Sequence, residues 1–262
     1  MKRILFYSSV NSLELFKTQK FYQIDISILK DLGYDVLLSN RIFDSLLFWK
    51  YDILFSYFYR YSFFAALLAK CFGKKTYFTG GIDSLDSDYA SAFNYKIQAL
   101  FFKLCYWVAD SCIIVSQSDL KNIFKVSSLK KKLSYSEHVI NTKLFIADVP
   151  KEKIFTSIVW MGDEGNVVRK GVDKALQIFA ELKKIPEFVD YRFVIIGRKG
   201  EGEVLVRSII DKYNLKGSVE LKGEVSEEDK INLLKQSKYY FQLSVSSQKM
   251  AIDCNLYLRC EQ

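Results

Sequence analysis

The sequence is poor in the residues from which metal centres and disordered linkers are made. Its 262 residues include two prolines and one histidine. Few prolines in a chain that is half apolar argue against disordered linkers and predict a compact protein with one large core or two smaller ones. The five cysteines include no C-x-x-C pair, and with His138 as the sole imidazole they cannot form an ordinary Cys/His zinc site. We therefore expect no metal site, and free thiols in a reducing cytoplasm.

Long apolar runs are also missing. The most apolar stretch, 53–72, is split by Arg60, and the apolar run at the start of the chain ends at Ser8, too early for a signal peptide. The aromatic stretch 53–72 fits either a buried strand and helix or, because lysines flank it, a segment lying against a bilayer surface. The sequence predicts a cytoplasmic protein without a membrane-spanning helix, with peripheral association at the inner face of the cytoplasmic membrane as an open alternative.

The net charge of +8 is unevenly distributed. Residues 1–150 hold 19 Lys and Arg against 13 Asp and Glu, whereas the remaining residues hold 19 against 17. Such a basic field, densest at 130–132, suits anionic lipid headgroups or nucleic acid. No recognisable nucleic-acid module accompanies the lysines, so we expect no nucleic-acid partner.

Short apolar runs alternate with helical patterns along the first half of the chain. Strands are expected at 4–8, 35–38, 53–56, 75–78 and 112–115. Apolar residues recur at helical spacing over 21–32, before Gly33, and further helices are expected near 60–72 and 91–108. This order predicts an α/β fold with a parallel, doubly wound sheet.

The alternation starts again after a basic segment at 125–136. Strands are expected at 157–161, 192–196, 219–221 and 239–243, and helices at 172–184, 203–213 and 226–237. Ser226 is a suitable N-cap for the last of these helices. Two successive α/β halves predict two Rossmann-like lobes that face a cleft.

The second half contains a candidate phosphate site. Gly162 ends a predicted strand, and after a loop Arg169, Lys170 and Gly171 are expected to open a helix, so that two cations and free backbone N–H groups converge. Gly197 and the segment 221–226 follow the next two strands at the same sheet edge, where open α/β sheets bind ligands. Taken singly, these residues fit an exposed charge pair and ordinary turn glycines equally well.

These stretches resemble the carboxyl-terminal lobe of family 4 retaining glycosyltransferases, the group 1 transferases with the GT-B fold. The similar segments of this lobe are 170–176, 193–197, 219–226 and 234–244, and those of the first lobe are 25–36, 109–118 and 138–145. The resemblance implies an acceptor-side lobe at 1–150 and a nucleotide-sugar-binding lobe at 151–262, incomplete at its carboxyl end.

The resemblance implies transfer of a sugar from a UDP- or GDP-linked donor to a glycolipid or oligosaccharide acceptor, with retention and without a cofactor, in the assembly of lipopolysaccharide or exopolysaccharide. Arg169 and Lys170 would stabilise the leaving diphosphate. The residues near the nucleotide would be Gly162, Gly171, Gly197, Gly223, Glu224 and Val225. On the acceptor side, Gly80, Gly81 and Asp83 are candidates, although they fit a simple turn equally well.

The chain departs from the family pattern at three places. Asp163 stands where the family has an arginine, and His138 lies in the interlobe segment, where a hydrogen-bonded loop residue is expected in place of the family's first-lobe histidine. After Ser244 the family's pair of glutamates does not follow. Two hypotheses therefore stand: a transferase, truncated or part of a longer protein, and an inactive module that docks to a membrane or partner through its basic first lobe. A Rossmann oxidoreductase is disfavoured because no G-x-G-x-x-G follows the first strand.

Overall fold

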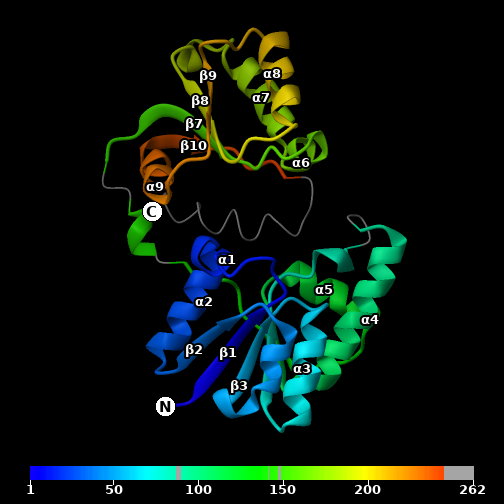
Figure 1. Ribbon diagram of the computed structural model, residues 1–262. Helices are drawn as coiled ribbons and strands as arrows, with labels where there is room; N and C mark the ends of the chain where they lie inside the picture. Colours follow the sequence, from blue (N-terminus) through cyan, green and yellow to red (C-terminus); the bar gives the residue numbers. More distant parts are fainter. Residues whose placement is uncertain (87–89, 141, 147–148, 245–262) are drawn as a thin grey trace. The chain divides into compact units, whose positions relative to one another are not determined.

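The computed structural model describes residues 1–86, 90–140, 142–146 and 149–244 (Figure 1). The chain divides into two compact units between Val139 and Ile140, earlier than the predicted boundary after residue 150. Each unit is built on a parallel sheet of its own, so the predicted α/β class with parallel sheets is confirmed. None of the helices in the described ranges is long and apolar enough to cross a bilayer.

The first unit contains a six-stranded parallel sheet in the order β2-β1-β3-β4-β5-β6. Its strands are β1 (Arg3–Ser8), β2 (Asp35–Ser39), β3 (Ile53–Tyr57), β4 (Lys75–Thr79), β5 (Ser111–Ile114) and β6 (Leu133–Tyr135). Leu5 of β1 pairs with Leu37 of β2 on one side and Leu54 of β3 on the other. The sequence predicted all of these strands except β6, a three-residue edge strand that follows the lysine triplet.

Helices cover both faces of this sheet. They are α1 (Leu15–Thr18), α2 (Lys20–Asp31), α3 (Ser62–Cys71), α4 (Ala92–Val108) and α5 (Gln117–Val126), with short 3-10 turns η1 (Ile42–Leu46), η2 (Phe48–Lys50) and η3 (Asp83–Leu85). Ile4 and Phe6 of β1 pack toward α1 and α2, whereas Leu5 and Tyr7 pack toward α3 and α4. Because both faces are covered, the four successive residues 4–7 of β1 are all apolar, as is usual for parallel strands.

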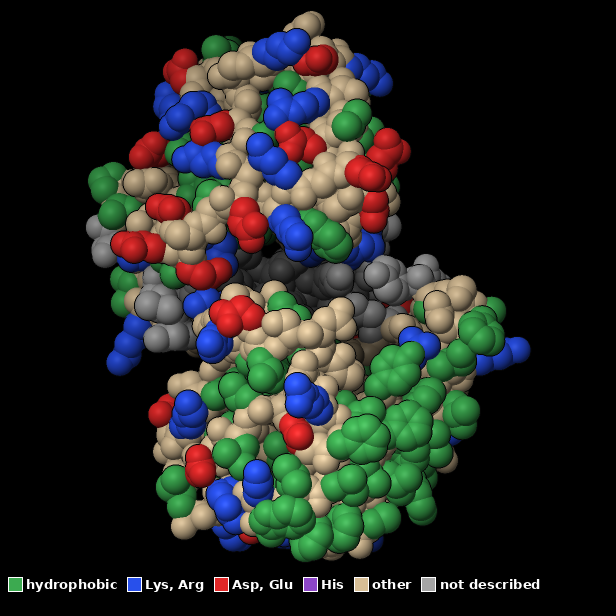
Figure 2. All heavy atoms as spheres, viewed as in Figure 1, with side chains coloured by type: hydrophobic (Ala, Val, Ile, Leu, Met, Phe, Trp, Pro, Cys, Tyr) green, Lys and Arg blue, Asp and Glu red, His purple; other side chains and the backbone are tan. Residues whose placement is uncertain are grey.

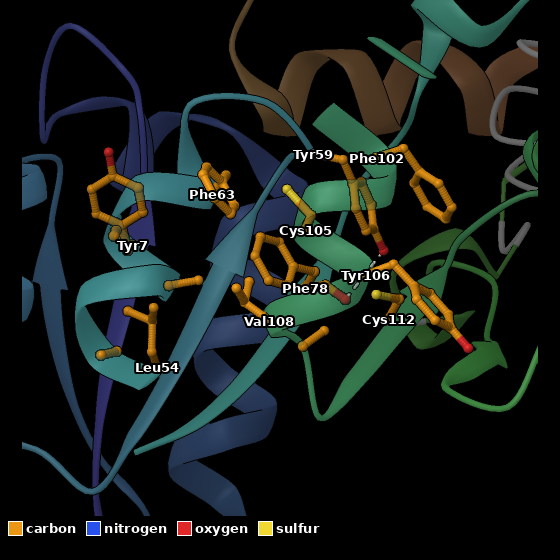
Figure 3. Packing of buried hydrophobic residues seen from close by; sticks show 14 of the residues in the cluster. Tyr7, Leu54, Tyr59, Phe63, Phe78, Phe102, Cys105, Tyr106, Val108 and Cys112 are labelled. Carbon is orange, nitrogen blue, oxygen red and sulfur yellow. Dashed lines mark hydrogen bonds between the residues drawn. The ribbon is translucent and has the colours of Figure 1, made fainter. Parts of the chain in front are cut away.

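The core under α3 and α4 is rich in aromatic rings and thiols (Figure 3). The Tyr59 hydroxyl donates a hydrogen bond to the Ile113 carbonyl at 2.9 Å, and its ring lies 5.7 Å from that of Phe78. Cys105 and Cys112 lie in the same core, and burial raises the pKa of the Cys112 thiol to about 12. Both are free thiols and remain protonated at neutral pH.

The second unit contains a four-stranded parallel sheet in the order β10-β7-β8-β9. The strands are β7 (Glu152–Ile158), β8 (Arg192–Ile196), β9 (Val219–Gly223) and β10 (Ser237–Tyr240). The predictions for β7 and β10 were shifted toward the carboxyl end. The apolar run 157–161 misled the prediction because only its first two residues pair in the sheet, and the rest form the loop that follows β7.

The helices of the second unit are α6 (Glu164–Arg169), α7 (Val172–Leu182), α8 (Glu203–Lys212) and α9 (Glu227–Gln236), with short turns η4 (Thr142–Phe145) and η5 (Pro186–Phe188). Helices α6, α7 and α8 pack on one face of the sheet around Phe155 and Phe193, and α9 packs on the other around Ile154 and Val194. The Asp229 amide donates to the Ser226 hydroxyl at 3.0 Å, which confirms Ser226 as the N-cap of α9.

Candidate functional site

The strand order of the second sheet creates a switch point beside β7. The chain places β7, β8 and β9 side by side in sequence order, then crosses to the opposite side of β7 to form β10. In open α/β sheets, ligands bind outside the carboxyl ends of the strands where the order reverses. In this unit the order reverses between β7 and β10, whose carboxyl ends lead into the segments 159–163 and 241–244, respectively.

The turn formed by Arg169, Lys170 and Gly171 lies at this switch point. Gly171 has a left-handed φ of 70° and directly precedes α7. A Cβ atom added at Gly171 would lie 2.0 Å from the carbonyl oxygen of Leu243, so the backbone of the turn is in close contact with the segment after β10. No other residue type fits here without a shift of the backbone.

One part of the predicted phosphate site is wrong. The stretch expected to be a loop is helix α6, and Arg169 is its last residue and does not open the next helix. The Lys170 amide donates to the Asn166 carbonyl at 3.0 Å and the Gly171 amide to the Val168 carbonyl at 3.0 Å, so both are used within the helix. An anion bound here would therefore contact the side chains of the two cations and not the backbone amides of Lys170 and Gly171.

Asp163 explains why α6 forms. Its carboxylate accepts a hydrogen bond from the Asn166 amide at 2.6 Å and so caps the first turn of the helix. The acid that stands in place of the family's arginine therefore has a local structural role. The signal was present in the sequence, since an N-cap aspartate is followed directly by Glu164, an acid suited to the first turn of a helix.

The guanidinium of Arg169 is held in place through Asn166. Nη2 of Arg169 donates to the Asn166 side-chain oxygen, and Nδ2 of Asn166 donates to the Trp160 carbonyl at 2.9 Å. This chain of hydrogen bonds ties Arg169 to the loop directly after β7. Sequence reasoning missed Asn166 and Trp160, because their role depends on the fold of α6.

Two of the predicted glycines bring three strand ends together. Gly197 has a φ of 134°, and a Cβ atom there would lie 1.9 Å from the Val159 carbonyl oxygen. The Gly197 amide donates to the Gly223 carbonyl at 2.8 Å. The ends of β7, β8 and β9 are thereby joined at one edge. Contact of these glycines with a nucleotide stays a prediction.

The remaining residues predicted near a nucleotide differ in how exposed their side chains are. Gly162 lies under the Trp160 indole, since a Cβ atom there would be 2.6 Å from the ring. Val225 packs with the core beneath α9, so its side chain faces the interior, whereas Glu224 is exposed. Trp160 itself is 56 % exposed and presents a planar ring at this edge of the sheet.

Two further cations that the sequence analysis did not single out lie in the loop after β8. Arg198 and Lys199 are exposed, and the Met161 amide donates to the Arg198 carbonyl at 2.9 Å, which joins this loop to the one after β7. The stem of Lys199 lies against Gly223, whose added Cβ would be 3.0 Å from Cε of the lysine. With Arg169 and Lys170, these side chains give the edge two pairs of adjacent cations.

In the first unit, the predicted acceptor-side turn follows β4. Gly80 has a φ of 106° and contacts Phe58, whose ring would lie 3.1 Å from an added Cβ. The turn through Gly81 is fixed farther along, where the Ile82 amide donates to the Asp119 carboxylate at 3.4 Å. Asp83 begins η3, and its side chain lies outside what the structure describes. The turn therefore lies at the carboxyl edge of the first sheet, and its contact with an acceptor stays a prediction.

A polar pocket of about 700 Å³ lies at the carboxyl ends of β1 and β2. Its polar lining consists of Asn11, Ser12, Ser39, Asn40, Arg41 and Asp44. The Ser39 hydroxyl donates to the Asp44 carboxylate at 2.6 Å, and the Asn40 amide group donates to the Val10 carbonyl at 3.0 Å. These hydrogen bonds fix the walls of a site rich in donors and acceptors, which sequence reasoning did not identify.

His138 lines a smaller pocket of about 230 Å³ together with Asp25. Burial lowers the pKa of His138, and the charge of Asp25 partly opposes this shift. Burial raises the pKa of Asp25, opposed by the hydrogen bond that Tyr57 donates to it and by the charge of His138. The imidazole thus packs beside a carboxyl group in the first unit.

Stability should fall on acidification through His138. Because its folded pKa lies below the ordinary value, the unfolded state binds more protons around pH 6, so stability is full above about pH 6.5 and is lost as the pH falls. The slope from one such group is at most about 1.4 kcal/mol per pH unit. Urea unfolding at several pH values should show that His138→Gln loses less free energy of unfolding on acidification than wild type does. Equal losses in the two proteins would show that His138 is not the source of the pH dependence.

Comparisons with known proteins concern the fold and the second unit. Residues 165–252 match the family model described as glycosyl transferases group 1. The matched segment includes Arg169, Lys170, Gly197 after β8 and Gly223 at the end of β9. A search of curated proteins finds no match.

Solved structures with a similar fold include Anabaena HepE, a sucrose-phosphate synthase and a galactosyltransferase. Anabaena HepE in complex with UDP and glucose aligns with a TM-score of 0.69 at 11% identity, over 99% of this chain and 79% of HepE. Sucrose-phosphate synthase from Thermosynechococcus elongatus aligns with a TM-score of 0.62 at 13% identity, over 93% of this chain and 76% of the synthase. The lipopolysaccharide outer core galactosyltransferase WaaB aligns with a TM-score of 0.56 at 14% identity, over 97% of this chain and 78% of WaaB. The chain therefore has the fold of GT-B glycosyltransferases, and its second unit carries the segment that matches the group 1 model.

Proposed function

We propose that this protein is a retaining glycosyltransferase of family 4 that transfers a sugar from a UDP-linked donor to a glycolipid or oligosaccharide acceptor. The observation that carries the proposal is the Arg169-Lys170-Gly171 turn, which lies at the switch point of the second sheet with the guanidinium held by Asn166. Structural neighbours support the donor class, since HepE is described in complex with UDP and glucose. A GDP-linked donor is the alternative.

The chemistry follows from where charge develops. The bond between the anomeric carbon and the diphosphate oxygen breaks, the acceptor hydroxyl oxygen bonds to that carbon on the same face, and the hydroxyl proton passes to an oxygen of the leaving diphosphate. Negative charge then builds up on the leaving diphosphate, and Arg169 and Lys170 stabilise it where a metal ion would otherwise act. We propose that no cofactor takes part, so transfer should survive a chelator of divalent cations.

The acceptor side belongs to the first unit. We propose that the polar pocket at the ends of β1 and β2 and the Gly80–Gly81–Asp83 turn bind the acceptor, because both offer polar groups at the carboxyl edge of that sheet. A glycolipid acceptor suits a protein at the inner face of the cytoplasmic membrane, and the basic excess of residues 1–150 supports peripheral association there. Assembly of lipopolysaccharide or exopolysaccharide is the proposed setting, supported by the similarity to WaaB.

Nucleotide binding can be measured directly through Trp160. A variant with Trp49→Phe and Trp107→Phe keeps only this indole, and UDP bound at the switch point should change its emission in a saturable way. A variant that keeps only Trp107 is the control and should not respond. Wild-type protein should also gain thermal stability with UDP or GDP. If neither nucleotide changes Trp160 emission nor stabilises the folded protein, the donor site is refuted.

A second candidate function is a binding module that does not catalyse transfer. The observation that favours it is Asp163, which caps α6 where the family has an arginine. The two functions differ in an assay with radiolabelled UDP-sugars and extracted glycolipids as acceptors. Label in the lipid fraction excludes the inactive module, whereas UDP binding without any transfer supports it.

A further inference from the structure

The first unit exposes a broad apolar surface over α3 and α4 (Figure 2). We call this surface the aromatic face. Its exposed members include Trp49, Tyr61, Phe64, Phe93, Leu100 and Trp107. Single exposed apolar residues are normal in soluble proteins, but a continuous apolar surface marks an interaction site.

Helix α4 carries one stripe of this face along its whole length. Phe93, Leu100 and Trp107 follow each other at intervals of seven residues and are 72 %, 57 % and 68 % exposed. Residues seven apart lie on the same side of a helix. The opposite side of α4 supplies Phe102 and Cys105 to the core, so α4 has apolar residues on both sides.

Helix α3 and the turn η2 supply the rest of the face as packed rings. Tyr61 and Phe64 lie 6.3 and 6.2 Å from the ring of Phe101, which links α3 to α4. Phe48 stacks on Phe72 at 4.3 Å, which links η2 to the end of α3. These mutual contacts make the face one continuous surface whose rings hold each other in place.

The charges within the aromatic face have one sign. The three segments that form it, 48–50, 60–75 and 92–108, contain seven Lys and Arg and no Asp or Glu; one of the seven, Lys70, pairs with Asp110 just outside them at 2.9 Å. On α4, Lys96 and Lys103 are exposed and each follows an exposed apolar residue by three positions, which places them within the stripe. The guanidinium of Arg60 lies 5.4 Å from the centre of the Tyr61 ring.

We propose that the aromatic face docks the protein in the headgroup region of an anionic bilayer. Tryptophan, tyrosine and phenylalanine side chains suit the boundary between headgroups and acyl chains, and lysines among them reach the lipid phosphates. The absence of acids from these three segments removes the repulsion that anionic lipids would otherwise meet. The inference rests on this surface and not on the proposed transferase activity.

The three tryptophans of the chain provide a matched test. Trp49 and Trp107 belong to the aromatic face, whereas Trp160 lies in the second unit with similar exposure. A variant with Trp49→Phe and Trp160→Phe should show a blue shift with vesicles of phosphatidylcholine and phosphatidylglycerol, and quenching by brominated lipid. A variant with Trp49→Phe and Trp107→Phe keeps only Trp160, which should show neither change in the protein that floats with the vesicles.

Matched substitutions test the electrostatic and the apolar contributions to vesicle binding. Lys96→Gln and Lys103→Gln should each weaken vesicle binding about fivefold, the equivalent of about 1 kcal/mol per basic residue at an anionic surface. Lys212→Gln, an exposed lysine on α8 of the second unit, should leave it unchanged. Leu100→Ser should weaken binding about tenfold, whereas Val204→Ser, a 70 % exposed residue of α8, should not. Circular dichroism checks that each variant is folded.

Several results would overturn the proposal. The proposal is refuted if wild-type protein does not float with anionic vesicles. It is also refuted if brominated lipid quenches the emission of Trp160 but not that of Trp107. Self-association that Leu100→Ser abolishes, without vesicle binding, would assign the face to contacts between copies of this chain. Because nucleotide binding is measured separately through Trp160, loss of membrane docking and loss of the donor site give different results.

Discussion

Gly197→Ala is expected to lower the free energy of unfolding by about 3–5 kcal/mol. Two costs combine at this position. An alanine is strained at a φ of 134°, and its Cβ would lie 1.9 Å from the Val159 carbonyl oxygen, so the loops after β7 and β8 would have to move apart. Urea unfolding followed by circular dichroism measures the change, and UDP binding should be lost with it because the same loops form the proposed donor site.

Gly217→Ala is the matched control for backbone strain. Gly217 lies in the same unit with a φ of 81°, but nothing stands within 4 Å of an added Cβ. We expect a loss of only about 1–2 kcal/mol there, the cost of a left-handed residue other than glycine. Equal losses at the two positions would show that close packing of the loops after β7 and β8 has no energetic weight.

Lys170→Gln is expected to lower the rate of sugar transfer about 10²- to 10³-fold while the protein stays folded. The reason is that charge on the leaving diphosphate is greatest in the transition state, so loss of a cation lowers kcat more than it weakens donor binding. Steady-state kinetics with a radiolabelled UDP-sugar gives both quantities. Lys170→Arg should recover part of kcat, since it restores the charge with a different shape.

Lys174→Gln serves as the control for that experiment. Lys174 is an exposed lysine on α7, one turn beyond Gly171, and it changes the net charge by the same amount. We expect its kcat and KM to match those of wild type. A similar loss of kcat in both variants would assign the effect of Lys170 to the general field of the unit and not to contact with the diphosphate.

Strands β1, β3 and β8 were predictable from the sequence because consecutive residues in each are buried, which gives continuous apolar runs. β8 was predicted with its observed bounds, 192–196, since a run of four apolar residues ends at a glycine with a positive φ. β6 escaped prediction because two of its three residues are exposed and the strand follows a lysine triplet. Hydrophobic pattern alone does not mark such edge strands.

The position of β10 beside β7 is a matter of topology that no local pattern contains. It arises from pairing between residues about eighty positions apart, for example Tyr240 with Thr156. This pairing brings Leu243 to Gly171 and so creates the setting of the candidate site. The residue types at 169–171 therefore indicated an anion-binding site, but the groups that surround these residues could be identified only from the fold.

The aromatic stretch 53–72 shows a different limit of sequence reasoning. A buried strand and helix and a surface against a bilayer were treated as alternatives. In the structure β3 is buried, and α3 buries Ala65, Ala66 and Ala69 on one side while it exposes Phe64 on the other. A helix that is apolar all round fits both interpretations, and only the positions of its neighbours decide which side is covered.

The pairing of β10 with β7 also affects how the second unit is made. Among the described strands of this unit, β7 is the first to leave the ribosome and β10 the last, so β7 waits with one edge uncovered while some eighty further residues are added. Exposed strand edges are templates for pairing with other chains, and distant pairings form slowly. Newly made chains should therefore depend on chaperones until residues 237–243 arrive, and expression at reduced temperature should raise the yield of folded protein.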